Sequence, residues 1–190
     1  VCVGAGFIGS NIAGTLADHT DYRVVVVDEF GSSEKWRNLS KHHIYEIISP
    51  SEVFHWLEAN INELDAIIHM GAISSTTETN VDLILETNFT LSRKLWNWAA
   101  VNKKRFIYAS SAATYGAGEA GFDDANTADA LGKLKPLNAY GWSKHLFDQF
   151  VLTATSAPAD KVPSQWVGLK FFNVYGPNEY HKGEQASVIE

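Results

Sequence analysis

Gly4-Ala5-Gly6-Phe7-Ile8-Gly9 is the stretch that decides the fold. It follows a short apolar run, Val1-Cys2-Val3, and opens a segment with helical periodicity. A Gly-x-Gly-x-x-Gly spacing at a strand-to-helix junction is typical of a dinucleotide-binding unit. Gly4 allows a tight turn, Gly6 lets a pyrophosphate approach the backbone, and Gly9 lets the helix pack on the strand. The N–H groups and the positive dipole end of the helix would then face the phosphates.

An acidic residue stands where the ribose of a dinucleotide is expected to bind. Residues 23–28 are a buried strand by their run of valines, and Asp28 ends it 19 residues after Gly9. A merely structural glycine-rich turn is the alternative interpretation, and the position of Asp28 argues against it. The sequence therefore predicts a dinucleotide site.

Opposite charges leave the choice between NAD and NADP open at this point. Asp28 would repel a 2′-phosphate, which favours NAD. Lys35 and Arg37 follow in the next loop and could bind that phosphate. Each of these two cations is explained equally well as a solvated surface charge.

Apolar runs alternate with helical patterns along the rest of the chain. This alternation predicts an α/β fold with a Rossmann-like, doubly wound parallel sheet. The expected strands after the glycine loop are residues 23–28, 44–48, 65–70, 105–110 and 165–172. The expected helices are residues 7–16, 50–59, 82–101 and 138–154, and residues 116–134 are expected to be loop.

The expected domain organisation is a dinucleotide-binding domain over residues 1–175, followed by the start of a substrate-binding lobe over residues 176–190. Val1-Cys2-Val3 is short for a first strand, and no closing signal precedes Glu190. We therefore expect the sequence to be a fragment that begins inside its first strand and lacks most of the second lobe.

Composition excludes several classes of function. The chain has 190 residues, is 45% hydrophobic and carries a net charge of −7. This charge argues against nucleic acid or an anionic membrane as the main partner. One cysteine, Cys2, allows no internal disulfide, and no apolar run is long enough to span a bilayer.

We expect a cytoplasmic protein. The adjacent histidines His42 and His43 do not share a face, so no metal site is predicted.

A Tyr-x-x-x-Lys motif suggests catalysis. In Tyr140-Gly141-Trp142-Ser143-Lys144 the phenol and the ammonium lie on one helix face. A cation beside a phenol lowers the pKa of the phenol, which would give a base for an alcohol proton while a nicotinamide takes the hydride. Ser111 follows an expected strand, at the carboxyl end where sites in parallel sheets lie, and could hold that alcohol beside Tyr140. A turn or a helix cap is the alternative for a single serine.

Longer stretches carry a resemblance to a known family. They cover residues 71–78, 108–116, 136–144 and 171–183. Together they resemble the extended short-chain dehydrogenase/reductases that act on nucleotide sugars, and within these the ADP-glyceromanno-heptose 6-epimerase family. The segments Ser74-Ser75-Thr76-Thr77-Glu78 and His181-Lys182-Gly183 are the specific ones. The resemblance covers essentially the whole chain.

The resemblance implies an isomerase. Its substrate would be ADP-D-glycero-manno-heptose, converted to the L-glycero epimer by transient oxidation and re-reduction at C6 for the heptose supply of lipopolysaccharide. The tightly bound cofactor would be NADP, with NAD as the alternative. Tyr140 and Lys182 would be the two acid/base groups, and Ser111 would orient the reacting hydroxyl. Lys144 would bind the nicotinamide ribose and tune Tyr140.

The resemblance also implies a set of binding residues. Those for the cofactor are Gly4, Gly6, Phe7, Ile8, Gly9, Asp28, Glu29, Lys35, Met70, Gly71, Ala72, Ile73, Ser74, Lys144 and Val174. Those for the substrate are Ser111, Asn173 and Glu184. The sequence departs from the family at Cys2, usually threonine, and Val3, usually glycine. Glu29, neutral in some members, weakens the NADP assignment, whereas Lys35 matches the family's phosphate-binding lysine.

Two other functions stay open from the sequence. One is another nucleotide-sugar epimerase or a dehydratase, although Ala112-Ala113 stands where a dehydratase would place an Asp-Glu pair. The other is a non-catalytic dinucleotide-sensing protein, which would have no need of Ser111, Tyr140 and Lys144 together. We also expect a homo-oligomer, since in this fold the helices over residues 82–101 and 138–154 often pair across a two-fold axis.

Overall fold

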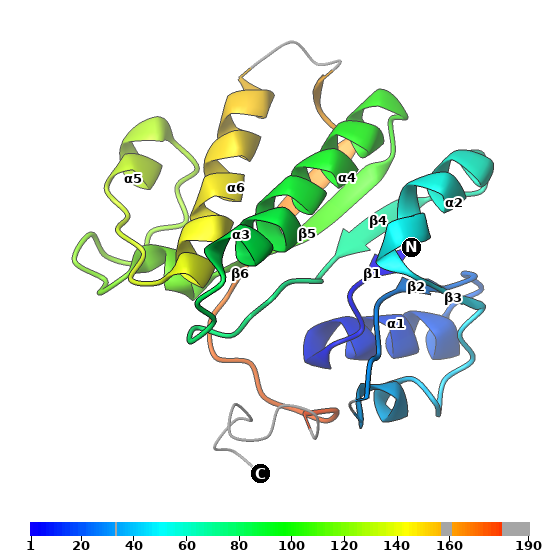
Figure 1. The fold of residues 1–190 in the computed structure, drawn as a ribbon. Coiled ribbons are helices and arrows are strands. Elements are labelled where there is room, and N and C mark those ends of the chain that lie inside the picture. Colours follow the sequence, from blue (N-terminus) through cyan, green and yellow to red (C-terminus); the bar gives the residue numbers. More distant parts are fainter. Residues whose placement is uncertain (33, 157–160, 180–190) are drawn as a thin grey trace. The chain divides into compact units, whose positions relative to one another are not determined.

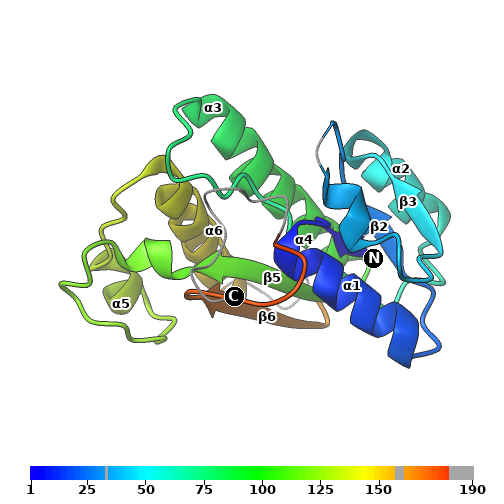
Figure 2. The same cartoon turned by 90° about the horizontal axis from the view of Figure 1, so that it is seen from below.

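Parallel strand pairing confirms the predicted α/β class (Figures 1 and 2). The computed structural model describes residues 1–32, 34–156 and 161–179. The chain divides into two compact units, which we describe separately. The first contains Val1–Gly71 and the chain from Asn173 onward, and the second contains Ala72–Phe172.

The first unit is built on four parallel strands. Their order is β3 (Glu46–Ile48), β2 (Val25–Val27), β1 (Cys2–Val3) and β4 (Ala66–His69). The chain runs from β1 to β2 and β3 on one side and places β4 on the other side of β1, so the order reverses there. Ligands of open parallel sheets bind outside the carboxyl ends of the strands at such a reversal. The glycine loop follows β1 at this point.

Helices cover both faces of these four strands. The helices α1 (Phe7–His19) and α2 (Val53–Ala59) lie on opposite faces (Figures 1 and 2). Two short 3-10 helices, η1 (Glu34–Asn38) and η2 (Pro50–Glu52), follow β2 and β3. The valines of β2 are all buried, as expected for a central parallel strand covered on both faces.

The second unit contains a pair of parallel strands, β5 (Arg105–Ser111) and β6 (Gln165–Phe171), in register from Arg105 with Gln165 to Ser111 with Phe171. The helices α4 (Leu91–Val101) and α6 (Ala139–Thr155) contact β5 and each other, and in Figure 1 they cover one face of this pair. Trp96 of α4 is fully buried and meets Phe106 of β5 edge-to-face at 5.6 Å between ring centroids.

Short elements complete the second unit. The segments α3 (Val81–Ile84) and η3 (Leu85–Thr90) precede α4, η4 (Ala112–Tyr115) follows β5, and α5 (Ala128–Gly132) precedes α6. The predicted helix over residues 82–101 is thus present but contains one π-helical segment, η3. The prediction of loop over residues 116–134 is wrong for Ala128–Gly132, because the Thr127 hydroxyl caps this helix by accepting from the Ala130 N–H at 3.2 Å.

The remaining predicted helices and strands are found with ends that differ by a few residues, α1 reaching His19 and β2 shortening to Val25–Val27. Within the described residues, no helix has the length and apolarity needed to cross a membrane. The expected second lobe over residues 176–190 stays a prediction, because most of it lies outside the described residues.

Candidate functional site

The glycine loop has the close backbone approach that its spacing predicts. Gly4 has a φ of +98°, and its N–H donates to the Val27 carbonyl at 2.8 Å. A Cβ atom on Gly4 would lie 2.3 Å from the backbone nitrogen of Gly71, and one on Gly9 would lie 1.9 Å from the carbonyl oxygen of Gly4. Neither position has room for a side chain. The residues present thus fit a pyrophosphate cradle at the N-terminus of α1, where Gly6 is the N-cap.

Cys2 and Val3, the departures before the loop, are both buried in β1. The Cys2 thiol donates to the Gly9 carbonyl across 3.6 Å, so it braces the start of α1 from inside the core. Burial raises the pKa of this thiol to about 11, which keeps it protonated and unreactive at neutral pH. Cys2 therefore has a structural role beneath the glycine loop.

Asp28 and Lys35 form an ion pair. The Lys35 ammonium donates to Asp28 Oδ1 at 2.7 Å, and both side chains are largely buried. The Glu29 N–H donates to the same oxygen at 2.7 Å, and the Ala5 N–H of the glycine loop donates to Oδ2. The sequence analysis weighs Asp28 and Lys35 against each other, whereas in the fold Lys35 offsets the negative charge of Asp28 beside the loop.

The end of β4 completes this part of the first unit. The N–H groups of Met70 and Gly71 both donate to the Val3 carbonyl, at 2.8 and 2.7 Å. These two predicted cofactor residues therefore lie at the glycine loop. Of the others, Phe7 is buried and Ile8 half-buried in the first turn of α1, Glu29 and Asn173 are exposed, and Val174 is half-buried.

The second unit brings Ser111 and Tyr140 together. Ser111 ends β5, and its hydroxyl accepts from the Ala113 N–H at 3.1 Å as the cap of η4. The same side chain lies close enough to the Tyr140 phenol to lower the pKa of that phenol. Asn138 caps α6 by accepting from the Gly141 N–H at 2.8 Å, which places Tyr140 in the first turn of that helix. Ser111 is thus a cap that also lies beside the phenol, and its holding of the substrate alcohol stays a prediction.

Burial controls the charges of the Tyr-x-x-x-Lys pair. It raises the pKa of Tyr140, and the neighbouring Ser111 side chain offsets this increase only in part. The pKa of Tyr140 is therefore raised in the described chain, whereas the sequence analysis predicts that Lys144 lowers it. The Lys144 ammonium instead donates to the Ala109 carbonyl at 2.9 Å, and burial lowers its own pKa to about 8 despite the nearby charge of Asp148.

Asn88 is a residue beside the candidate site that the sequence analysis missed. It lies fully buried in the π-helical segment η3. Its side-chain oxygen accepts from the Ile73 N–H at 2.8 Å, and its amide donates to the Ile73 carbonyl at 3.0 Å and to the Ser143 hydroxyl at 3.1 Å. It thereby ties a predicted cofactor residue, Ile73, to the helix of Lys144. A polar residue on the buried stripe between Ile84 and Leu95 was the available signal.

The other predicted residues are more dispersed. Ala72 and Ser74 flank Ile73 in the second unit, where Ala72 is half-buried and Ser74 is exposed. Lys182 and Glu184 lie outside the described residues.

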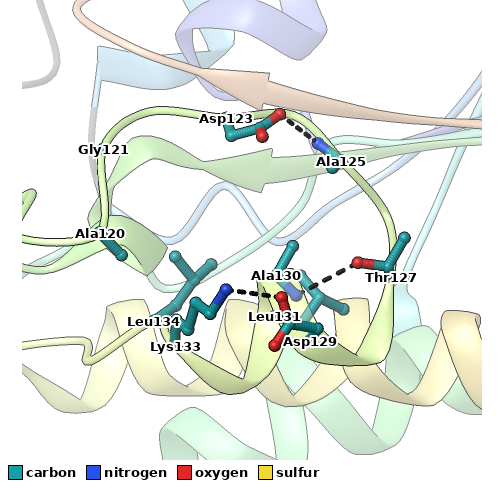
Figure 3. A pocket seen from close by; sticks show the side chains of 10 residues that line it. All are labelled: Ala120, Gly121, Asp123, Ala125, Thr127, Asp129, Ala130, Leu131, Lys133 and Leu134. Atoms are coloured by element: carbon teal, nitrogen blue, oxygen red, sulfur yellow. Dashed lines mark hydrogen bonds and ion pairs between the residues drawn. The ribbon is translucent and has the colours of Figure 1, made fainter.

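A pocket of about 210 Å³ in the second unit is lined by residues between Ala120 and Leu134 and holds none of the predicted site residues (Figure 3). Across the described ranges, no cluster of three histidine, cysteine or acidic residues is placed to hold a metal ion.

Sequence comparison places these features in a family. The profile described as the NAD dependent epimerase/dehydratase family matches residues 2–190. The ADP-L-glycero-D-manno-heptose-6-epimerase of Fusobacterium nucleatum is 44% identical over 188 residues, which are 98% of this chain and 55% of that protein. The protein of the same name from Nitratidesulfovibrio vulgaris is also 44% identical, over 98% of this chain and 56% of its own length. The chain therefore spans about half the length of the curated relatives it matches.

Two solved structures resemble this chain in fold. The ADP-L-glycero-D-manno-heptose-6-epimerase of Helicobacter pylori matches with a TM-score of 0.74 at 34% identity, covering 97% of this chain and 58% of that one. A UDP-N-acetylglucosamine 4-epimerase from Methanobrevibacter ruminantium, solved with UDP-N-acetylmuramic acid, has a TM-score of 0.76 at 24% identity over 98% of this chain and 58% of its own. The second likeness shows the fold alone.

Proposed function

Because the chain belongs to the NAD dependent epimerase/dehydratase family, we propose that the protein containing it epimerises C6 of ADP-D-glycero-manno-heptose to the L-glycero epimer. The observation that carries this proposal is the Ser111 side chain beside the Tyr140 phenol, with the buried Lys144 one turn further along the same helix. The identity of 44% to proteins named for this reaction supports ADP-heptose as the substrate. The product would supply heptose for lipopolysaccharide.

The proposed mechanism needs no net redox change. A bound nicotinamide would supply hydride acceptance and hydride return. Tyr140, beside Ser111, would remove and return the proton of the C6 hydroxyl, while Ser111 would hold that oxygen. Lys144 would hold the nicotinamide ribose. The two epimers present the hydroxyl in different directions, so a second acid/base is useful, and we assign it to Lys182.

We assign NADP as the cofactor. Gly4, Gly9, Met70 and Gly71 would hold the pyrophosphate region, and Lys35 would contact the 2′-phosphate. The ion pair with Asp28 supports this, because Lys35 is already held at the end of β2 and offsets the carboxylate that would repel the phosphate. The remaining cofactor residues predicted from the resemblance, and Asn173 and Glu184 as substrate contacts, are part of this proposal.

A binding experiment tests the cofactor. Dissociation constants for NADP and NAD are measured for the full-length wild type and for Lys35→Ala. We expect the variant to lose affinity for NADP and keep its affinity for NAD. Lys94→Ala is the matched control, since Lys94 is an exposed lysine on α4. Unchanged NADP binding in Lys35→Ala would remove Lys35 as the phosphate ligand.

A turnover experiment tests the reaction. Full-length protein is mixed with ADP-D-glycero-β-D-manno-heptose, and the C6 epimer ratio is followed by NMR. Tyr140→Phe and Lys182→Met should each slow epimerisation by on the order of 100-fold or more while cofactor stays bound. Tyr22→Phe and Lys94→Met, both at exposed positions, are the controls. Wild-type turnover in Lys182→Met would leave Tyr140 as the sole assigned base.

The cellular setting follows from the same proposal. We place the protein in the cytoplasm, where a nucleotide sugar and a reduced Cys2 are both expected. We also propose a homo-oligomer without nucleic acid or membrane as a partner. Size-exclusion chromatography with light scattering on the full-length protein measures its assembly, and a monomer at micromolar concentration would contradict that part.

A further inference from the structure

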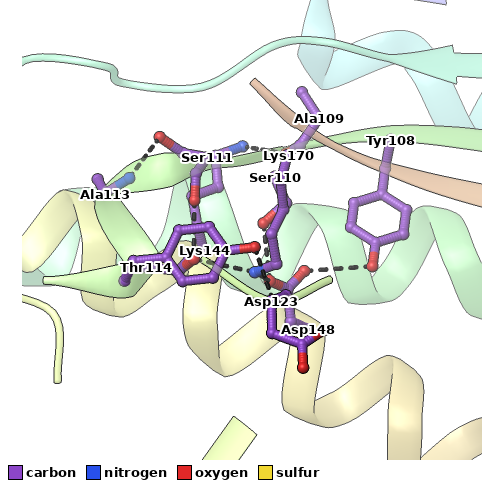
Figure 4. A network of polar contacts seen from close by, with 11 residues as sticks. Tyr108, Ala109, Ser110, Ser111, Ala113, Thr114, Asp123, Lys144, Asp148 and Lys170 are labelled. Atoms are coloured by element: carbon purple, nitrogen blue, oxygen red, sulfur yellow. Dashed lines mark hydrogen bonds and ion pairs between the residues drawn. The ribbon is translucent and has the colours of Figure 1, made fainter. Parts of the chain in front are cut away.

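A buried carboxylate lies one turn after Lys144. Asp148 of α6 is 4% exposed, and three side chains donate to it from β5 and β6 (Figure 4). Its Oδ2 accepts from the Lys170 ammonium at 2.6 Å and from the Ser110 hydroxyl at 2.7 Å. Its Oδ1 accepts from the Tyr108 hydroxyl at 3.2 Å. A buried charge this well satisfied holds its neighbours in one arrangement.

Lys170 extends this arrangement to the turn that carries Ser111. Besides Asp148, the ammonium donates to Thr114 Oγ1 at 2.9 Å and lies 5.2 Å from the centroid of the Tyr115 ring. Thr114 in turn donates to the carbonyl of Ser111 at 2.8 Å. Lys170 of β6 thus connects α6, through Asp148, with η4, through Thr114.

The turn and the helix are also tightly packed against each other. A Cβ atom on Gly141 would lie 2.6 Å from the Ala113 carbonyl oxygen, so α6 touches η4 without an intervening side chain. At such a contact, a small rotation of η4 displaces the Ser111 hydroxyl relative to Tyr140. A displacement of about 1 Å in a reacting group can cost on the order of 100-fold in rate.

We propose that Lys170 is a positioning residue for the reaction: it ties Asp148 to Thr114 and thereby sets the position of Ser111 against Tyr140. The inference rests on the proposed function of Ser111 and Tyr140. Lys170 itself would touch neither substrate nor cofactor. Lys170 should therefore affect the rate of the chemical step, and the affinities for substrate and cofactor should depend little on it.

The experiment uses full-length protein and separates kcat from KM for C6 epimerisation. The variants are Lys170→Met, Lys170→Arg, Asp148→Asn and the double variant Asp148→Asn/Lys170→Met, with Lys94→Met as the control. We expect Lys170→Met to lower kcat by about 10- to 100-fold, with KM and the cofactor dissociation constant changed by less than about threefold. Lys170→Arg keeps a cation with several donors and should recover most of kcat.

The double variant tests whether both residues act through one connection. Its kcat should be no lower than that of the worse single variant, because removing either end already breaks the tie. Multiplicative losses would contradict the proposal. So would wild-type kcat in Lys170→Met, or an equal loss of kcat and cofactor affinity without recovery in Lys170→Arg.

Controls keep the outcomes distinct. If Lys170→Met is not recovered as folded protein, Lys170→Gln takes its place, since it retains a donor without the charge. The wild type is assayed first. Absence of epimerisation there contradicts the proposed function, whereas wild-type turnover together with undiminished turnover in Lys170→Met contradicts the positioning role alone.

Discussion

Lys144 illustrates what burial does to a single residue. Its ammonium is held by one backbone carbonyl, that of Ala109, and burial lowers its pKa to about 8 from an ordinary value of 10.5. Tyr140 shifts in the opposite direction, upward, for the same reason, because burial disfavours the charged form of each group. Without cofactor, burial therefore favours the uncharged forms of both Tyr140 and Lys144.

This shift predicts a pH dependence of stability. Between about pH 8 and 10.5 the unfolded state binds a proton at Lys144 more readily than the folded state does, so stability gains with rising pH in that window. Below about pH 8 the penalty is constant. Compared with Lys144→Met, full-length wild type without cofactor should gain about 2 kcal/mol in free energy of unfolding between pH 7 and pH 9.5.

Denaturant titrations at the two pH values measure this difference. Lys94→Met serves as the control, because its side chain is more than half exposed and should show almost no such gain. If the unfolding free energy of wild type relative to Lys144→Met is the same at both pH values, or falls as the pH rises, burial does not depress the pKa of Lys144.

At the scale of elements, the junction of β1 and α1 requires a glycine at position 9. A Cβ at position 9 would lie 1.9 Å from the Gly4 carbonyl oxygen, a backbone atom that cannot rotate away. We expect Gly9→Ala to lower the stability of the full-length protein by about 2 kcal/mol or more and to weaken cofactor binding. Gly132→Ala in α5 meets nothing within 4 Å and should stay within about 0.5 kcal/mol of wild type. Thermal unfolding with and without NADP decides between these outcomes.

The π-helical segment η3 depends on Asn88 in a comparable way. Asn88→Ala would leave the N–H and carbonyl of Ile73 and the hydroxyl of Ser143 without their partner. We expect a loss of about 2–4 kcal/mol in unfolding free energy. Asn102→Ala removes a single amide contact, to the Trp98 carbonyl, and should cost less than half as much. Equal losses for the two variants would mean that Asn88 does not hold the Ile73 loop.

At the scale of the whole molecule, cofactor binding should appear as stability. A ligand that binds only the folded state adds about 2.7 kcal/mol at 100 times its dissociation constant. NADP at that excess should therefore raise the unfolding temperature of the full-length wild type by several degrees. Tyr140→Phe should show the same increase, because the phenol acts in the proposed chemical step. Differential scanning calorimetry measures both, and a loss of the increase in Tyr140→Phe would assign the phenol to cofactor binding.

Local patterns in the sequence determined the α/β class, the helices and strands apart from α5, η1 and η4, and the geometry of the glycine loop. Each depends on near neighbours: valine runs make buried strands, Asn138 caps its own helix, and Gly4 and Gly9 leave room for backbone contacts. The sequence analysis also predicts Ser111 beside Tyr140, with Ser111 at the carboxyl end of a strand, where sites in parallel sheets lie.

Tertiary structure alone decided the charges and the ties between segments. Asp28 pairs with Lys35, Asn88 reaches Ser143 across 55 positions, and Lys170 reaches Asp148 across 22. Burial, which depends on the packing of several elements, reverses the pKa shift predicted for Tyr140. No periodicity encodes these contacts. The Asp28–Lys35 pair depends on the path of the loop after β2, and the other two arise only when elements distant in sequence pack together and their polar groups must find partners away from water.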